Sequence, residues 1–494
     1  MDPVDARYPR DEVGAAADAY AAAPLLNCLL REVGERVGPH THRLRASGRL
    51  LRVRGGRRPT HPEVHADGAW HPLTHAELVK LTAEELRRHT GLSNSELPTE
   101  MLDSREAVAA LLRARAHATA PADPYLRSEQ SLITGHPYHP APKARGGGPV
   151  AAWLPYAPEA YARFPLTLLG VREDTVVEEG DTTALDDLGR APHGYRLLPA
   201  HPWQLALLGR ELAPAFTDGR LVRLGHTPGP VWPTAAVRTV YAPEDDLFLK
   251  FSLDVRITND VRRLWRHDLL RLHRTDTAVA TAFAGLPGAW LSDRGYRTAD
   301  FAFEELAVLV RDGFGAHLAP GATPLLAAAL TEDFDGNPLD RTADPAAWWE
   351  AYLRAVVPPA LGALHHGVVL EAHLQNTLVA VDSDGTPVQA LFRDAEGVKL
   401  LPEVARPAGW ERLVYGLVVN NLMEIAEAVA ERHPGTGLWP AARRELARHG
   451  EIPEIAALLD APTLPGKTNL LLRWTAADGA DARYLPLPNP LRGA

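Results

Sequence analysis

The sequence predicts an α+β fold built from two or three closely packed domains or subdomains. The chain has 494 residues, too many for one ordinary hydrophobic core. Between about residues 130 and 255, dense proline and glycine with short alternating apolar runs favour strands, whereas helical periodicity dominates after residue 255. Because the sequence contains neither an internal repeat nor a long linker, we expect the domains to pack against one another.

Three segments are the clearest predicted helices. The first is 11–37, which we expect to break near Pro24 because proline removes a helical hydrogen bond. The second is 348–369, interrupted by Pro358-Pro359, and the third is 413–432.

The amino-acid composition argues against several classes of protein. With 46% hydrophobic and 23% charged residues, the chain is globular rather than disordered. Its single cysteine, Cys28, rules out an internal disulfide and a thiolate metal cluster, and a net charge of −10 argues against a nucleic-acid surface. No uninterrupted apolar run reaches the ~18 residues that cross a bilayer, and the first residues do not resemble a secretory signal. We therefore expect a cytoplasmic protein that binds neither nucleic acid nor membrane.

Lysine is rare in this chain. Only five of the 52 basic residues are lysines, namely Lys80, Lys143, Lys250, Lys399 and Lys467. Solvated surface positions accept arginine instead, but a compact ammonium bound to a phosphate or carboxylate does not exchange as easily, because its size and donor geometry differ. The retained lysines are therefore candidates for a binding site.

Residues 371–394 predict a β-hairpin with a polar open end. Strands at 377–381 and 387–392 flank a turn in which Gly385 can adopt a positive φ. Asn376 and Asp394 each lie nine residues from Gly385, so they face each other or nearly so, with Cβ atoms about 5 Å apart.

An amide oxygen and a carboxylate at that separation suit Mg²⁺, which prefers hard oxygen ligands and takes few of them from protein. Glu371 and His373 add polar groups at the same end. An ordinary hairpin that begins with turn-forming polar residues explains the same pattern, and these residues alone do not separate the two interpretations.

A glycine-rich segment at 135–148 is the second unusual feature. Its two His-Pro pairs place His136 and His139 on extended backbone, because proline disfavours α conformation in the residue before it. A zinc site is the weaker interpretation, since no third ligand is marked out. The glycine run beside Lys143 and Arg145 suits close approach of the backbone to an anion.

Basic residues also gather between 238 and 263. A strand that carries Lys250 leads into a turn, where we expect Thr258 and Asn259 to cap a helix that includes Arg262. A helix N-terminus flanked by arginines is a ready anion site. A solvated basic face is the alternative.

Together these segments resemble the aerobactin-synthetase-like (IucA/IucC) family, the NIS synthetases, which make siderophores without a nonribosomal peptide synthetase. The resemblance covers nearly the whole chain in order. It rests on Gly135-His-Pro-x-His-Pro-x-x-Lys-x-Arg-x-Gly147, His201-Pro-Trp-Gln204, Lys250-x-Ser-x-x-x-Arg-Ile-Thr-Asn259, Glu371-x-His-x-Gln-Asn376 and Arg393-Asp394.

For the fold, the resemblance implies a cupped-hand architecture. Residues 1–130 would form an N-terminal thumb-like region and residues 131–340 a sheet-rich fingers region with the nucleotide-binding motifs. Residues 341–494 would form a mainly helical palm that contains the hairpin at 377–393. The family tendency is a homodimer.

For the reaction, the resemblance implies that ATP and Mg²⁺ adenylate a small carboxylic acid with release of pyrophosphate, after which an amine, or less often an alcohol, attacks the acyl-adenylate. The implied acids are citrate and its monoamides, 2-oxoglutarate and succinyl-type hydroxamate precursors. The implied nucleophiles are a diamine, an N-hydroxydiamine or an amino acid. The product would be a siderophore or a related metabolite.

The resemblance also implies roles for single residues. Lys250, Arg262 and His373 would be catalytic, His373 either donating a hydrogen bond to the acyl oxygen or helping to deprotonate the amine. Thr258, Arg262 and His373 would contact the acid. The residues expected around ATP are Lys143, Arg145, Gly147, Arg238, Lys250, Asn259, Arg262, Gln375 and Asn376. Those expected at the metal are Glu371, Asn376 and Asp394.

Two features depart from the family pattern. Many members have Ser-x-Arg where this chain has Ala236-Val-Arg238, so a hydroxyl contact to the nucleotide or acid is missing. The chain is also shorter than the usual member, although every motif survives. Two other functions remain open: an ATP-dependent phosphotransferase, which would release ADP, and a non-catalytic homologue acting as a binding protein.

Overall fold

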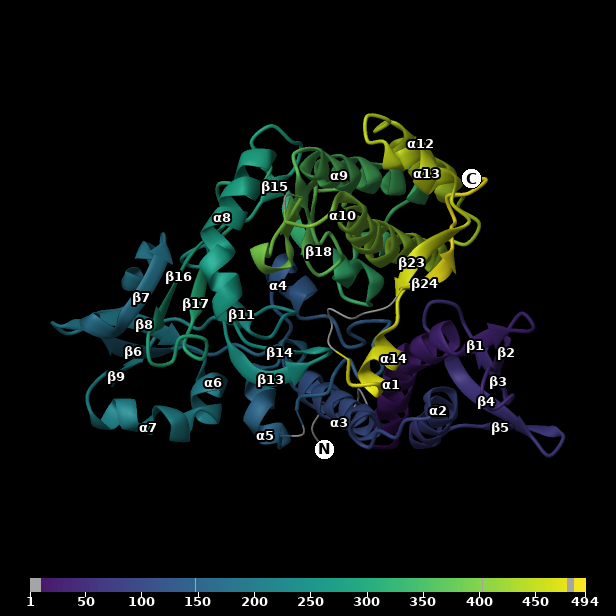
Figure 1. The fold of residues 1–494 in the computed structure, drawn as a ribbon, viewed down its shortest axis with the longest axis horizontal. Coiled ribbons are helices and arrows are strands. Elements are labelled where there is room, and N and C mark those ends of the chain that lie inside the picture. Colours follow the sequence, from purple (N-terminus) through teal and green to yellow (C-terminus); the bar gives the residue numbers. More distant parts are fainter. Residues whose placement is uncertain (1–9, 147, 402, 478–483) are drawn as a thin grey trace.

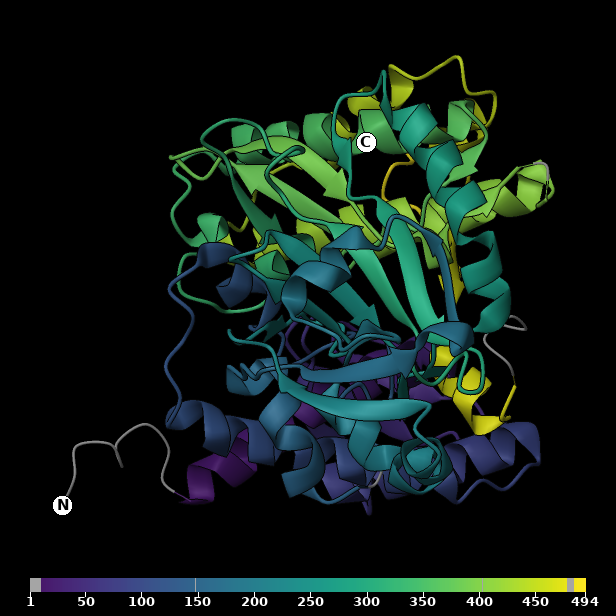
Figure 2. The same ribbon diagram turned by 90° about the vertical axis from the view of Figure 1, so that its left-hand side faces the viewer.

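Three large hydrophobic cores organise the molecule, one in each of three regions. The computed structural model describes residues 10–146, 148–401, 403–477 and 484–494. In Figure 1 the N-terminal region lies at the lower right, the sheet-rich middle region at the left and the C-terminal region above both. Figure 2 shows the same arrangement from the side, with the C-terminal region resting on the other two.

The N-terminal region combines three helices with an antiparallel sheet. Helix α1 (Arg10–Glu32) packs against α2 (His75–Thr90) and α3 (Glu96–Ala116). The sheet has the order β1-β2-β3-β4-β5, with bounds Gly34–Arg36, Thr41–Leu44, Leu50–Arg54, Thr60–Ala66 and Ala69–Pro72.

The predicted break in the first helix is wrong. Helix α1 runs through Pro24 and ends at Glu32. The side chains of Leu25, Leu26 and Leu29 are fully buried in the N-terminal core. Burial of this apolar face outweighs the one hydrogen bond that the proline removes.

Two antiparallel sheets share the core of the middle region. The smaller sheet has the order β8-β6-β9, with β6 Thr167–Arg172, β8 Tyr195–Ala200 and β9 Leu221–His226. The larger has the order β10-β11-β12-β17-β16-β7, with β7 Val176–Gly180, β10 Trp232–Pro233, β11 Thr239–Ala242, β12 Leu247–Phe251, β16 Asp293–Ala299 and β17 Val308–Asp312. Short helices α4 (Pro124–Glu129), α5 (Val150–Trp153), α6 (Pro202–Leu207) and α7 (Gly209–Thr217) border this region.

Helices dominate the C-terminal region, where they surround a four-stranded sheet. The helices are α8 (Arg266–Phe283), α9 (Pro345–His365), α10 (Arg406–Leu413), α11 (Glu424–Arg432), α12 (Trp439–Ala447) and α13 (Glu454–Asp460). The sheet has the order β15-β21-β20-β18, with β15 Ala289–Trp290, β18 Thr323–Leu326, β20 Thr377–Val381 and β21 Pro387–Phe392. The pairs β19–β22 (Val368–Val369 with Lys399–Leu400) and β23–β24 (Thr463–Lys467 with Tyr484–Pro488) are separate from it.

Two helices of this region are longer or straighter than predicted. Helix α9 continues through Pro358 and Pro359, with Trp349 and Val357 fully buried on its core face. Helices α10 and α11 are joined by the π-helical segment Val414–Met423, so the predicted helix at 413–432 is present and begins earlier. Core packing again outweighs the local effect of proline.

The membership of the hydrophobic cores indicates where the middle region gives way to the C-terminal region. The C-terminal core already includes Leu264, Leu269 and Leu272 from the chain around α8, well before residue 341. Strands β16 and β17 then return to the sheet of the middle region. We propose that the fingers and palm interleave between residues 264 and 341 rather than meeting at one boundary.

Two helices are long and apolar enough to cross a membrane by length and composition alone, Glu12–Glu32 and Arg406–Arg432. Their most apolar windows are 56% and 72% buried inside the protein. Helices in the core of a folded protein meet the same criterion, and the charged residues inside both helices fit that description.

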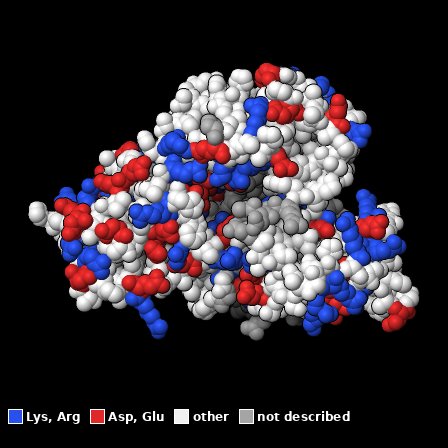
Figure 3. Space-filling view, in the orientation of Figure 1, with Lys and Arg blue, Asp and Glu red and all other residues white. Residues whose placement is uncertain are grey.

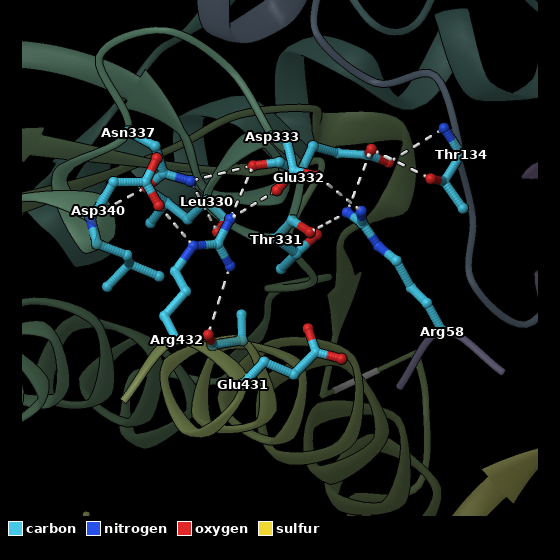
Figure 4. A network of polar contacts seen from close by, with 12 residues as sticks. Arg58, Thr134, Leu330, Thr331, Glu332, Asp333, Asn337, Asp340, Glu431 and Arg432 are labelled. Carbon is cyan, nitrogen blue, oxygen red and sulfur yellow. Dashed lines mark hydrogen bonds and ion pairs between the residues drawn. The ribbon is translucent and has the colours of Figure 1, made fainter. Parts of the chain in front are cut away.

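A polar network ties the N-terminal region to the C-terminal region (Figure 4). Arg58, between β3 and β4, donates to the carbonyl of Thr331 and lies 3.3 Å from Glu332 Oε2. The same carboxylate accepts from Thr134 N and Thr134 Oγ1 at 3.2 and 3.1 Å. Arg432, at the end of α11, donates to the carbonyl of Glu332 at 3.2 Å. The 331–333 loop therefore joins segments from all three regions.

His201 caps helix α6 from inside an aromatic cluster. Its Nδ1 accepts a hydrogen bond from Trp203 N (3.2 Å), and the rings of Tyr156, Phe164 and Phe251 surround it. The residue is 1% exposed, and burial lowers the pKa of the imidazole from 6.5 to about 3. The imidazole of His201 is therefore neutral in the folded protein at neutral pH.

We predict that His201→Asn flattens the pH dependence of stability. Between pH 3 and 6.5 the unfolded chain binds a proton at this site that the folded chain does not, so stability falls as the pH drops below about 6.5. Asparagine keeps the acceptor for Trp203 N but does not titrate. Urea unfolding should show the wild type losing about 2 kcal/mol more than the variant between pH 7 and pH 5. Equal losses in the two proteins would contradict this account.

Candidate active site

The predicted hairpin is formed by β20 and β21, with the bounds expected from the sequence. Gly385 in its turn has φ = +81°, the left-handed conformation that glycine adopts without strain. Arg393 N donates to Asn376 O at 3.2 Å, so Asn376 lies opposite Arg393 and one residue away from Asp394. Asn376 and Asp394, which flank the two strands, are therefore offset by one residue and nearly face each other, as predicted.

Asp394 leaves the hairpin in a strained conformation and receives two cationic side chains. Its φ of +85° lies in the left-handed region, which costs a non-glycine residue roughly 1–3 kcal/mol. Its Oδ1 accepts hydrogen bonds from Lys250 Nζ at 2.5 Å and from Arg311 at 3.4 Å. Burial disfavours the ionised carboxyl, but the charges of Lys250 and Arg311 outweigh that effect and hold the pKa of Asp394 well below its ordinary value.

A second carboxylate, Glu396, completes this ion cluster. Its Oε2 lies 2.7 Å from Lys250 Nζ and accepts from Arg238 at 3.0 Å. Lys250 is only 2% exposed in the central strand β12, so carboxylates rather than water surround its charge. Sequence reasoning did not single out Glu396; its place two residues after Asp394 is the signal that could have found it.

Asp293 and Arg311 support the backbone on which Asp394 stands. They are cross-strand partners in β16 and β17, and Arg311 Nε donates to Asp293 Oδ1 at 2.6 Å. The other carboxylate oxygen of Asp293 accepts from Ala395 N at 2.8 Å. Both residues are almost fully buried. Neither belongs to a recognisable local motif, which is why the sequence did not reveal them.

The segment that carries Thr258 and Arg262 is a β-hairpin, and the helix predicted there is wrong. Strand β13 (Leu253–Ile257) pairs with β14 (Asp260–Arg262) across a two-residue turn. Thr258 has φ = +61°, an outlier for a β-branched residue at a position where tight turns favour glycine. Thr258 and Asn259 thus close a hairpin instead of capping a helix.

Arg262 folds back over this turn. It donates to Thr258 Oγ1 at 2.7 Å, and Thr258 Oγ1 donates to the carbonyl of Ile257 at 2.6 Å. Arg238 donates to the carbonyls of Arg262 and Arg263 at 3.2 and 2.9 Å, while its other nitrogen contacts Glu396. Arg238 therefore connects the Thr258 turn with the ion cluster.

His373 lies between Asn376 and Glu371 at the open end of the hairpin. His373 Nδ1 accepts from Asn376 N at 3.3 Å, and its Nε2 lies 3.9 Å from Glu371 Oε2. The other oxygen of Glu371 accepts from Arg412 of α10 at 3.1 Å. Glu371 is thus paired with Arg412, and Glu396 is the carboxylate found beside Asp394. The side chain of Gln375 is exposed, and only its carbonyl is engaged, by Arg393.

Lys143 and Arg145 bind a buried carboxylate in this structure. Both lie near Glu159 Oε1, at 2.5 and 2.8 Å, and all three side chains are at most 6% exposed. Gly147, the third predicted residue of this loop, lies outside the described residues. Their contact with ATP phosphates stays a prediction.

The central face of the molecule is hollowed where the three regions meet (Figure 3). Lysine and arginine side chains gather along the upper margin of the hollow. Beside the ion cluster, a small pocket between α8 and residues 395–399 is lined by Leu269, Leu272, Leu309, Glu396 and Lys399. Burial lowers the pKa of Lys399, one of the five lysines, and nearby Arg412 adds to the effect.

Comparison with known proteins identifies the family to which this chain belongs. The model of the IucA / IucC family matches residues 124–332, which contain Lys143, Lys250 and Arg262. The rhizobactin siderophore biosynthesis protein RhbC of Rhizobium meliloti is 30% identical in a match that covers 74% of this chain and 75% of that protein. The chain belongs to the IucA/IucC family.

Further likenesses cover both halves of the chain. The L-2,3-diaminopropanoate–citrate ligase of Staphylococcus aureus is 29% identical over 75% of each chain. A second family model, described as a ferric iron reductase FhuF-like transporter, matches residues 346–482. The structure of ATP-bound aerobactin synthetase IucA from Klebsiella pneumoniae superimposes with a TM-score of 0.82 at 22% identity, over 96% of this chain and all of that one.

These likenesses confirm two predictions. The α+β cupped-hand architecture of NIS synthetases is the fold of this chain. The chain is an acid–amine ligase, the enzyme class predicted from its motifs. The roles of individual residues stay predictions.

Glu129 links the hairpin end with the Ala236 segment. Its Oε1 accepts from Arg393 at 2.6 Å and from Tyr125 Oη at 2.8 Å, and its Oε2 accepts from Ala235 N at 2.9 Å. Glu129 is fully buried, and Arg393 is 5% exposed. Burial opposes the charge of Arg393, but Glu129 outweighs that effect and raises the pKa of the guanidinium.

We predict that Glu129→Ala lowers the free energy of unfolding by roughly 3–5 kcal/mol, because it leaves the guanidinium of Arg393 buried without a partner. Asp335→Ala is the matched control: it removes the partner of Arg127, also on α4, but Asp335 is 85% exposed. This control should cost at most about 1 kcal/mol. Urea unfolding compares the two, and equal losses would show that the buried pair is not essential.

Proposed function

We propose that this enzyme adenylates citrate, or a closely related small polycarboxylate, with ATP and then joins the acyl group to an amine. The observation that carries this proposal is the convergence of Lys250 and Arg238 on Asp394 and Glu396, the carboxylates that leave the hairpin. Arg238 also donates to the backbone carbonyl of Arg262 and so ties Arg262 to this cluster. The names of two relatives, L-2,3-diaminopropanoate–citrate ligase and spermidine–citrate ligase, support citrate and an amine as the substrates. The bound ATP of the related aerobactin synthetase supports the nucleotide.

The cationic residues match the physical demand of adenylation. The reaction brings a carboxylate against a triphosphate, and the repulsion between these anions must be offset before the oxygen reaches phosphorus. Lys250 and Arg238 would bind phosphate oxygens in exchange for Asp394 and Glu396. Arg262, beside Thr258, would bind the acid; burial, with the nearby charge of Arg238, lowers the pKa of this guanidinium.

The donor set at the hairpin end fits a magnesium ion. Asp394 and Glu396 share Lys250 as a partner, and Mg²⁺ needs only one or two protein carboxylates when phosphates supply the other ligands. We propose Asp394, Glu396 and Asn376 as the protein ligands, in place of the predicted set with Glu371. When bound, Mg²⁺ would offset charge on the phosphates.

His373 is the proposed polar group on the acyl side. Nδ1 accepts from Asn376 N, so the tautomer with the proton on Nε2 is favoured, and this N–H can donate to an acyl oxygen. Proton transfer from the incoming amine is the alternative role, with Glu371 3.9 Å from Nε2. Siderophore or related metabolite synthesis, a cytoplasmic location and a homodimer are the expected setting.

We predict that purified enzyme releases pyrophosphate and AMP from ATP only with an acid and hydroxylamine present, citrate being the best of a panel that includes succinate and 2-oxoglutarate. Asp394→Asn should lower kcat by about 100-fold, because the proposed Mg²⁺ loses an anionic ligand and so offsets less of the charge on the phosphates. Coupled pyrophosphate release and nucleotide chromatography measure both. Release of ADP would instead identify a phosphotransferase, and no turnover with any acid and amine would favour a binding protein.

We predict that Arg262→Ala raises KM for the acid by about 10- to 100-fold, because the acid loses a charge-assisted hydrogen bond. The neighbouring Arg263 supplies the control: its side chain pairs with Asp254 at 2.6 and 2.7 Å, away from Thr258. Arg263→Ala should leave KM within about threefold of wild type, because its pair with Asp254 lies away from Thr258. Equal values for the two variants would reject Arg262 as the acid contact.

A further inference from the structure

Asn469 connects segments that are far apart in the sequence. It begins helix α14 (Asn469–Trp474), and its side chain is 2% exposed. Its Nδ2 donates to the carbonyl of Tyr138 in the His-Pro segment at 2.7 Å, and its Oδ1 accepts from Asn259 Nδ2 at 3.2 Å. One buried amide thus joins the C-terminal part of the chain to two loops of the site.

Helix α14 is a fixed base for this amide. Glu32, at the end of α1, accepts hydrogen bonds from Leu470 N and Leu471 N at 2.8 Å each. Leu470 and Trp474 are buried in the core of the N-terminal region. At the other end of the helix, Asn94 Nδ2 donates to the carbonyls of Arg473 and Trp474 at 3.3 and 2.9 Å.

The residue that Asn469 holds belongs to the strained turn. Asn259 directly follows Thr258, whose φ of +61° is costly for a β-branched side chain. Such a conformation persists only where surrounding contacts fix it. Arg262 braces the turn through Thr258 Oγ1 on one side, and Asn469 braces it through Asn259 on the other.

We propose that Asn469 is a positioning residue for acid recognition, holding the Thr258–Arg262 turn through Asn259 without touching the acid itself. The inference rests on the proposed function, in which Thr258 and Arg262 contact the carboxylic acid. It extends the site to a residue of the C-terminal segment that is not among the predicted site residues. It also gives a physical reason for the tight docking of α14 on the N-terminal region.

The test is the KM of the acid in acid-dependent pyrophosphate release by the full-length enzyme. Asn469→Ala should raise this KM by about tenfold while kcat changes by less than about twofold, because the lost hydrogen bonds hold the binding geometry. The matched control is Asn94→Ala, which breaks two similar hydrogen bonds to the other end of α14. The control should leave KM unchanged, whatever its effect on melting temperature.

A double-mutant cycle with Asn259→Ala tests the route of the effect. Because Asn469 acts through Asn259, the double variant should show about the same KM as either single variant. Should Asn469→Ala not fold by circular dichroism, Asn259→Ala removes the same contact from the turn side and should give the same rise. An unchanged KM, an equal rise in Asn94→Ala, or fully additive effects would overturn the inference. Wild-type enzyme without acid-dependent pyrophosphate release would instead contradict the proposed function.

Discussion

The contact of Lys250 with Asp394 and Glu396 is the interaction on which the site depends. Lys250 comes from the central sheet of the middle region, and the two carboxylates come from the segment that leaves the C-terminal hairpin. Taking these charges out of water is costly, and their mutual attraction repays that cost only with good geometry and further partners. Arg238, Arg311 and Asp293 supply those partners.

A buried cluster of this kind is weak evidence for stability but suits ligand exchange. In the proposed function, Lys250 and Arg238 would exchange their carboxylate partners for phosphate oxygens, and the carboxylates so released would bind Mg²⁺. The strained backbone conformations of Asp394 and Thr258 also fit a functional site, because strain of this kind is typical of such sites. Contacts with other parts of the chain hold both conformations, which local sequence preference does not favour. The fold thus keeps the two halves of the site in place from separate regions of the chain.

The features that could be predicted from the sequence are those that a local residue pattern determines. Gly385 and the flanking apolar runs set the bounds of the hairpin, and the retained Lys250 marked the strand that faces it. The alternation of apolar and polar residues could not identify Asp293 or Arg311 as part of the site. These two residues meet across neighbouring strands, and neither belongs to a local sequence motif. The helix expected to include Arg262 does not form, because Thr258 adopts a conformation that its intrinsic propensity disfavours and closes a hairpin instead. Pro24 and Pro358 did not break their helices, since core packing outweighed the local effect.

The central claim is that the carboxylate of the acid attacks the α-phosphorus of ATP within this ion cluster. Turnover of citrate labelled with ¹⁸O in its carboxylates tests it most directly. When the amine displaces AMP from the acyl-adenylate, one oxygen of the acid remains on the AMP phosphate. The account predicts one ¹⁸O in each AMP, read by mass spectrometry. Label in inorganic phosphate alongside ADP would contradict it, because the acid would then have attacked the γ-phosphorus.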